Sequence, residues 1–253
     1  MFFRATFRDG ALLLKTIGVI HELVDECSLQ LDADGIRIHA IDSSHVSLVT
    51  ASWRASEFDL YEWTGPIRIG MKLGNFLKIL KCCGKTETVT LTLQDSSDDV
   101  LIVAFENETR ASQFTLKLLD IEEDEWAIPS FQYDATIVMD SGEFLTVCKD
   151  LGTVADTTTC AISPDGLVMS ADGDMGSAVI AFKNLQTTDR ASMTVSFALR
   201  YLNTFAKGSV LASAVSLSFS QTMPLLVSYQ NNVSTLGFYL APKIDDDLTD
   251  DVM

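Results

Sequence analysis

Hydrophobic and polar residues alternate along several short segments of this chain, and residues 88–93 show the pattern most clearly. The sequence TVTLTL places every large apolar side chain there on one face, as a half-buried β-strand requires. Asp9-Gly10 is expected to form a turn after the first strand. In the first half of the chain, strands are predicted over residues 2–7, 29–31, 36–41, 46–53, 67–71, 88–93, 100–105 and 112–118.

Two segments between these strands repeat their apolar residues every three or four positions, which predicts amphipathic helices. Lys15, Lys78 and Lys81 lie off the apolar stripes, so we expect them to face solvent. The first stripe consists of Leu13, Ile17, Ile20 and Val24, and the second of Leu73, Phe76, Leu77 and Leu80.

The second half of the chain repeats the order of the first. A stripe of Phe144, Cys148, Leu151 and Ala155 lies 131 residues after the first stripe, and Asp165-Gly166 follows Asp34-Gly35 by the same offset. A constant offset indicates an internal duplication. The prediction is an α+β fold of two similar domains, each with two helices on one face of an antiparallel sheet. The remaining elements of the second half are a helix at Leu199, Leu202 and Ala206 and strands at 215–219, 225–229 and 236–240.

The stretch 119–133, LDIEEDEWAIPSFQY, divides the two halves. Its first part is a run of carboxylates without an apolar face, so it should be solvated and extended. Its second part is apolar and stiffened by Pro129, which biases Ile128 away from helix. We therefore predict an N-terminal domain over 1–118, a connector over 119–133, and a C-terminal domain with an acidic tail over 134–253. The connector is either a simple linker or one wall of a partner-binding groove.

Composition restricts the class of protein. The chain has 253 residues, 47% of them hydrophobic, and its first residues lack an apolar signal segment. Five cysteines without metal-ligand spacing predict reduced, mostly buried thiols in an intracellular protein. No apolar run approaches the length of a membrane span, so no membrane contact is expected. The formal net charge of −17 argues against nucleic-acid binding unless the 18 basic residues are concentrated.

The predicted helices carry a concentration of basic residues. All four can place basic groups on their free faces, whereas the acids gather in loops, the connector and the tail. Ordinary solvated helix faces are the alternative interpretation. The basic residues concerned are Lys15, His21, Lys72, Lys78, Lys81, Lys149, Arg200 and Lys207.

Four further segments, spread over both halves, resemble one family. They are IDSSHVSL at 41–48, LKILKC at 77–82, FALRYLN at 197–203 and YLAPKI at 239–244, the last followed by acids. This family is the eukaryotic DNA sliding clamps of the proliferating cell nuclear antigen type, and the resemblance covers essentially the whole chain. It implies a homotrimeric ring threaded on duplex DNA, with four helices per subunit inside and antiparallel sheets outside. A ring of this kind tethers replication and repair proteins to DNA and hydrolyses nothing.

The resemblance also implies three sets of functional residues. The DNA-facing set is Lys15, His21, Lys72, Lys78, Lys81, Arg110, Lys149, Arg200 and Lys207. The partner-binding set, which receives a short motif called the PIP box, is Ile41, His45, Val46, Trp126, Ile128, Pro129, Pro224, Tyr239, Ala241, Pro242 and Ile244. The subunit-interface set is Phe114, Leu116, Met175, Ala178 and Ile180, on edge strands at 112–117 and 175–182.

Three positions depart from the family pattern. His21 stands where the family often has lysine, so that DNA contact is weaker or pH-dependent. Trp126 is larger than the aliphatic residue usual there and narrows the expected groove. Pro164 replaces the modifiable lysine before the Asp-Gly turn, which excludes ubiquitin-type modification at that place.

No enzyme motif is present in the sequence, because it has no phosphate-binding loop, GxSxG or HExxH. The expected partners are double-stranded DNA, a replicative polymerase, a clamp loader, flap endonuclease, DNA ligase and other PIP-box proteins, in the nucleus and without a cofactor. Two alternatives stay open. One is an acidic metal-dependent hydrolase, and the other is a subunit of a hetero-oligomeric checkpoint clamp.

Overall fold

The structure is a computed structural model that describes residues 2–84, 87–95, 99–121, 132–182 and 192–243. The chain divides into two compact units. Unit 1 consists of Met1–Ile128 and Gln230–Gly237, and unit 2 of Pro129–Tyr229 and Phe238–Met253.

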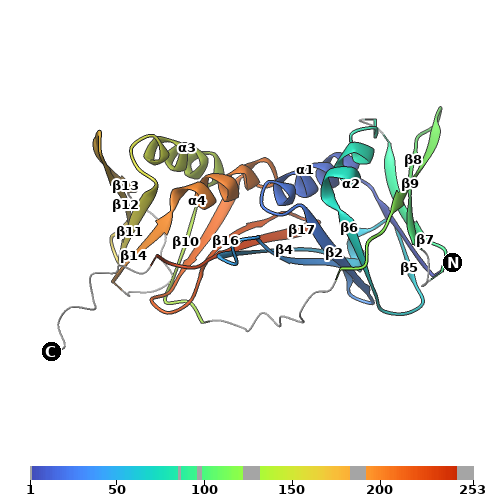
Figure 1. Ribbon diagram of the computed structural model, residues 1–253, viewed down its shortest axis with the longest axis horizontal. Coiled ribbons are helices and arrows are strands. Elements are labelled where there is room, and N and C mark those ends of the chain that lie inside the picture. Colours follow the sequence, from blue (N-terminus) through green and yellow to red (C-terminus); the bar gives the residue numbers. More distant parts are fainter. Residues whose placement is uncertain (1, 85–86, 96–98, 122–131, 183–191, 244–253) are drawn as a thin grey trace. The chain divides into compact units, whose positions relative to one another are not determined.

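The described residues of unit 1 form two α-helices and two antiparallel arrangements of strands (Figure 1). One sheet has the order β5-β1-β7-β8-β9, and a second group has the order β4-β3-β2-β6. The helices are α1 (Gly10–His21) and α2 (Leu73–Leu80). The strands are β1 (Phe3–Phe7), β2 (Glu26–Asp32), β3 (Gly35–Ile41), β4 (Ser47–Arg54), β5 (Leu60–Trp63), β6 (Ile67–Lys72), β7 (Thr88–Leu93), β8 (Val100–Glu106) and β9 (Ala111–Lys117).

Unit 2 repeats this plan. Its strands follow the order β13-β12-β11-β14 in one sheet and β10-β15-β16-β17 in a second group. Its helices are α3 (Ser141–Gly152) and α4 (Leu199–Ala206). The strands are β10 (Ala135–Asp140), β11 (Thr157–Ser163), β12 (Gly166–Gly173), β13 (Gly176–Phe182), β14 (Met193–Ala198), β15 (Ala214–Phe219), β16 (Leu225–Gln230) and β17 (Ser234–Leu240), the last of which begins in unit 1.

The predicted duplication is confirmed by the bounds of the elements. Helices α1 and α3 both have 12 residues, and both α3 and β11 begin 131 residues after their counterparts α1 and β2. Within each unit the two helices pack against each other on one side of the strands (Figure 1). The predicted α+β class with paired helices on antiparallel sheets is therefore confirmed.

An aspartate caps the N-terminus of each 12-residue helix, α1 and α3. The Asp9 carboxylate accepts the Leu12 N–H at 2.9 Å, and the Asp140 carboxylate accepts the Glu143 N–H at 2.8 Å. These contacts satisfy backbone donors that the first helical turn leaves open. The predicted turn at Asp9-Gly10 is therefore wrong, since Asp9 caps α1 and Gly10 is its first residue.

The hydrophobic stripes form the cores of the two units. In unit 1, Ile17 and Ile20 of α1 and Phe76 of α2 are almost completely buried. In unit 2 the Phe205 ring of α4 stacks on Phe238 with ring centres 4.6 Å apart and an interplanar angle of 8°. The polar sides of both helix pairs remain available to solvent.

Some described elements were not predicted individually. In unit 1 these are β5 and the 3-10 segment Ala55–Glu57. In unit 2 the 3-10 segment Lys207–Val210 was not predicted, and β10, β11, β12 and β14 were expected only through the duplication. Strand β5 pairs with β1 and forms one edge of the five-stranded sheet. Unit 2 has no corresponding strand beside β10 among its described residues.

Candidate DNA-facing and partner-binding surfaces

Lysines on the helices of unit 1 lie where the stripes predicted. Lys15 of α1, Lys78 of α2 and Lys81 at the end of α2 are exposed. None of these three lysines forms an ion pair with another described residue of the chain. Such cations can approach phosphate groups without first leaving an intramolecular partner.

Three other members of the DNA-facing set contact carboxylates. Lys72 Nζ lies 3.4 Å from Glu26 on the neighbouring strand, and Arg110 Nε lies 3.8 Å from Glu87, whose side chain is only 2% exposed. His21 Nδ1 lies 3.9 Å from Asp25. Glu26 was not identified as the partner of Lys72 from the sequence, because cross-strand neighbours are set by the register of the sheet. Asp25 follows His21 by four positions, and Arg110 and Glu87 lie in segments just outside the strands.

Helices α3 and α4 of unit 2 carry one basic residue each, and Lys207 follows the end of α4. Lys149, Arg200 and Lys207 are exposed, and the Arg200 guanidinium lies over the Tyr201 ring at 4.8 Å. Helix α3 also exposes Glu143 and Asp150. The expectation that acids gather in loops, the connector and the tail is therefore wrong for α3, where two exposed acids outweigh one lysine.

The loop 41–46 of unit 1 is organised by Asp42, which is 5% exposed. Its carboxylate accepts the N–H groups of Ser44, Val46 and Ser47 at 3.1, 2.9 and 2.7 Å. His45 has a φ of 55°, which the hydrogen bonds of this turn maintain. Ile41 and Val46 are half-buried and His45 is exposed. Asp42 is thus a positioning residue that the sequence alone did not single out.

The described partner-binding residues of unit 2 lie around the end of β17. Pro224, Tyr239 and Pro242 are half-buried and Ala241 is exposed. Burial raises the pKa of the Tyr239 phenol, and burial together with Tyr239 raises the pKa of Tyr133 to about 12. Both phenols are neutral at physiological pH and can donate hydrogen bonds. Trp126, Ile128, Pro129 and Ile244 lie outside the described residues.

Two of the sheets end in edge strands that the sequence predicted. Strand β9 is an edge of the five-stranded sheet in unit 1, and β13 is an edge of the four-stranded sheet in unit 2. Met175 and Val179 are 79% and 69% exposed, an unusual exposure for large apolar side chains. Phe114, Ala178 and Ile180 are half-buried, whereas Leu116 is buried within unit 1.

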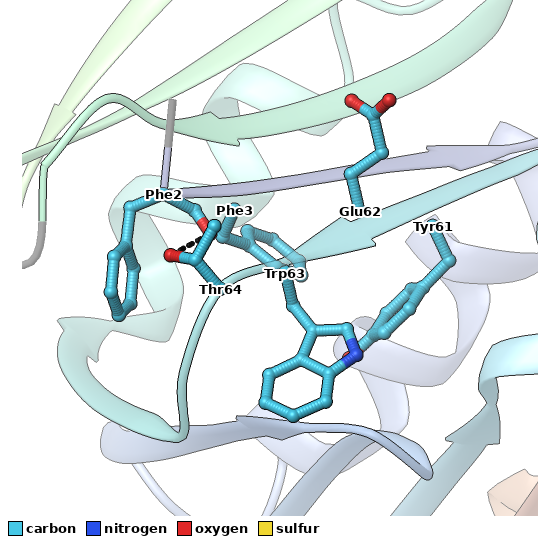
Figure 2. A pocket seen from close by; sticks show the side chains of 6 residues that line it. All are labelled: Phe2, Phe3, Tyr61, Glu62, Trp63 and Thr64. Atoms are coloured by element: carbon cyan, nitrogen blue, oxygen red, sulfur yellow. Dashed lines mark hydrogen bonds between the residues drawn. The ribbon is translucent and has the colours of Figure 1, made fainter.

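The unpredicted strand β5 forms the opposite edge of the sheet in unit 1. A hollow of about 480 Å³ lies beside it, and Figure 2 shows Tyr61 and Trp63 on one face of the strand and Glu62 on the other. The Thr64 hydroxyl donates to the Phe2 carbonyl at 3.3 Å, as the dashed line marks. Trp63 is 39% exposed, so an indole ring is accessible at this edge.

Within the described ranges no helix is long and apolar enough to cross a membrane. The same residues contain no group of three His, Cys, Asp or Glu side chains that could hold a metal ion. Cys27, Cys148 and Cys160 are buried free thiols, Cys83 is half-buried and Cys82 is exposed.

Two consecutive units, each with two lysine-bearing or arginine-bearing helices on antiparallel sheets, define a DNA clamp. The family model described as "Proliferating cell nuclear antigen, N-terminal domain" matches residues 1–126. The model described as "Proliferating cell nuclear antigen, C-terminal domain" matches residues 127–244. The chain belongs to the proliferating cell nuclear antigen family, whose members are sliding clamps that associate with DNA and with replication proteins. Membership points to a scaffold protein and not to an enzyme.

Proposed function

We propose that three copies of this chain close into a ring around duplex DNA and act as a processivity factor and docking platform. The observation that carries the proposal is the exposure of Lys15, Lys78 and Lys81, which pair with no carboxylate among the described residues, on a chain whose net charge is −17. A few cations that meet phosphates give weak contacts that do not depend on base sequence. An acidic remainder repels other DNA, so the ring is retained by topology and slides.

Edge-strand pairing supports ring closure. A head-to-tail contact between β9 of one copy and β13 of the next would remove two exposed edges at every interface. A heterologous contact of this kind closes into a ring when the rotation per subunit fits a whole turn. Phe114, Ala178 and Ile180 would pack at this interface, and Met175 would lose its high exposure.

Partner docking is proposed at the residues around the 41–46 loop, the end of β17 and the connector. An aromatic anchor of a PIP-box motif buried there would supply most of the affinity. The partners would be a replicative polymerase, a clamp loader that opens the ring, flap endonuclease and DNA ligase, and their work places the chain in the nucleus. The proposal includes the division of the chain into two domains joined by a connector over 119–133.

The test is retention on DNA after loading. The purified chain is loaded by a clamp loader onto nicked circular DNA, and the bound fraction is measured before and after the circle is cut. A topological ring stays on the circle and leaves through the ends of linear DNA. Equal retention on both forms would show direct adhesion and would overturn the sliding ring.

The same experiment separates the homotrimer from the checkpoint-clamp alternative. A homotrimer loads without any other clamp subunit. A chain that loads only when related subunits are added would belong to a hetero-oligomeric ring.

A further inference from the structure

A small cavity of about 220 Å³ lies in unit 1 beside the first turn of α1. Its walls come from the end of β1, the start of α1, the end of β4 and the following 3-10 segment. Asn232 and Val233, in the turn before β17, complete it, and they belong to the same unit. None of these residues was singled out for function by the sequence or belongs to the proposed DNA, partner or subunit surfaces.

The floor of this cavity is aromatic. Phe7 and Trp53 are 6% and 2% exposed, and their rings meet at 87° with centres 6.2 Å apart. Phe58 meets Phe7 at 69° with ring centres 4.7 Å apart. Edge-to-face groups of this kind accept a further ring in the same geometry, so the floor favours an aromatic guest.

The rim of the cavity carries more negative than positive charge. Arg8, Asp9 and Glu57 line it directly, and Arg8 is paired with Asp59. Glu57 lies 3.5 Å from Arg54. These three carboxylates and two guanidinium groups leave one negative charge, which adds to the acidic field of the whole chain. A cation beside the guest is therefore favoured and an anion is disfavoured.

The volume limits the size of the guest. Sites for small-molecule ligands usually enclose about 300–1,000 Å³. A cavity of about 220 Å³ is smaller than this range but far larger than the space of one water molecule. It therefore fits one large side chain better than a complete cofactor.

We propose that this cavity is a docking site for a short peptide segment of a partner protein, which inserts one aromatic side chain and carries a basic residue next to it. The site lies wholly within unit 1, so it does not depend on ring closure. A partner bound here would leave the proposed PIP-box residues unoccupied and could be held at the same time as a PIP-box protein.

The three tryptophans of the chain allow a site-specific test. The full chain is labelled with 5-fluorotryptophan and titrated with the dipeptide acetyl-Phe-Lys-amide, and the ¹⁹F signals are assigned with Trp63→Phe and Trp126→Phe. The Trp53 signal should shift in a saturable manner, because this indole forms the floor. Trp63, exposed at the hollow in Figure 2, reports non-specific binding of aromatic compounds and should not shift in parallel.

Peptide chemistry and two substitutions give the controls. Acetyl-Phe-Glu-amide should bind at least about three-fold more weakly, and acetyl-Ala-Lys-amide should leave Trp53 unchanged. Asp9→Asn keeps a capping side-chain oxygen but removes the charge, so the Phe-Lys affinity should fall about two- to five-fold. Asp165→Asn, on an exposed turn of unit 2, is the matched charge control and should have no effect.

Filling the cavity tests its location. Val233→Phe should abolish the Trp53 shift while the circular dichroism spectrum stays unchanged, and if this variant does not fold, the Asp9→Asn comparison decides. The proposal is overturned if Trp53 does not shift at millimolar peptide or if Trp63 shifts equally. It is also overturned if N-acetylphenylalaninamide, which lacks the basic residue, binds as tightly as the dipeptide.

Discussion

The Tyr61 hydroxyl joins the unpredicted strand β5 to the turn between β2 and β3. It lies 2.6 Å from the carbonyl oxygen of Asp32 and 2.7 Å from that of Gly35. Tyr61→Phe removes this donor from a partly buried position. We expect a loss of about 1–3 kcal/mol in the free energy of unfolding at pH 7, measured by urea denaturation.

The same substitution has a defined pH dependence. Burial, and secondarily the Asp32 carboxylate, raise the pKa of Tyr61 to about 12, against about 10 in an unfolded chain. Below pH 10 the phenol is neutral in both states, so its stabilising contribution is complete. Between pH 10 and 12 the unfolded state ionises first, so that contribution falls. The stability difference between the wild-type protein and Tyr61→Phe should therefore shrink over this window, and a constant difference would contradict the assignment.

Exposed lysines on α2 provide the residue-scale test of DNA contact. Lys78→Glu and Lys81→Glu, made separately, should each lower DNA affinity and reduce the slope of log K against log salt by about 0.9. Arg68→Glu, an exposed cation on β6, is the matched control and should leave the slope unchanged. If the slope of log K against log salt is the same in all three variants, α2 does not belong to the DNA-facing surface.

At the scale of the hairpin, alanine substitutions at Gly35 and Gly176 distinguish the cost of backbone strain from the cost of steric clash. Gly35 has a φ of 141° and Gly176 a φ of 142°, so an alanine is strained equally at both positions. A Cβ on Gly35 would lie 2.0 Å from the Trp53 carbonyl oxygen, whereas a Cβ on Gly176 meets nothing within 4 Å. Gly176→Ala should cost about 1–3 kcal/mol. Gly35→Ala should cost about 4 kcal/mol or more, or prevent folding, and thermal unfolding of both variants measures the difference.

Most elements follow from local pattern, and the exceptions have physical reasons. The period-two strands and the stripes of α1 to α4 were predicted because burial of one face dictates their periodicity. Strand β5 was missed because it has only four residues, Leu-Tyr-Glu-Trp, which do not alternate. The start of α1 was misplaced because Asp-Gly is typical both of turns and of a capped helix.

The candidate sites were less predictable than the elements. Exposed lysines could be named from the helical stripes, but the partners of Lys72 and Arg110 depend on strand register and on turns far along the chain. The aromatic cavity near α1 could not be predicted from a sequence motif. Phe7, Trp53 and Phe58 are separated in the sequence, and each of them resembles an ordinary core residue. Such sites arise from tertiary packing and not from a local pattern.

Ring assembly can be tested on the whole molecule by blocking one edge at a time. Along β9, residues that are hydrogen-bonded to β8 alternate with residues that are not. The Leu118 N–H donates to the Asp99 carbonyl at 2.8 Å, so Leu118 belongs to a hydrogen-bonded pair. Thr115, three residues earlier, therefore directs its N–H away from β8. Thr115→Pro therefore removes a donor from the free edge only. In β13 the same alternation is counted from the pair Gly173 and Gly176, which closes the hairpin between β12 and β13. It directs the Val179 N–H away from β12, so Val179→Pro removes a donor from the free edge of β13.

The wild-type chain should have a native mass of about 83 kDa by light scattering, three times 27.7 kDa. Each proline variant should be a monomer, because one of its two edges cannot pair. An equal mixture of Thr115→Pro and Val179→Pro should form dimers of about 55 kDa, since the first keeps an intact β13 edge and the second an intact β9 edge. A dimer in the mixture but in neither variant alone requires a head-to-tail interface between these two strands. Trimers of either single variant would place the interface elsewhere, and circular dichroism of each monomer excludes unfolding as the cause.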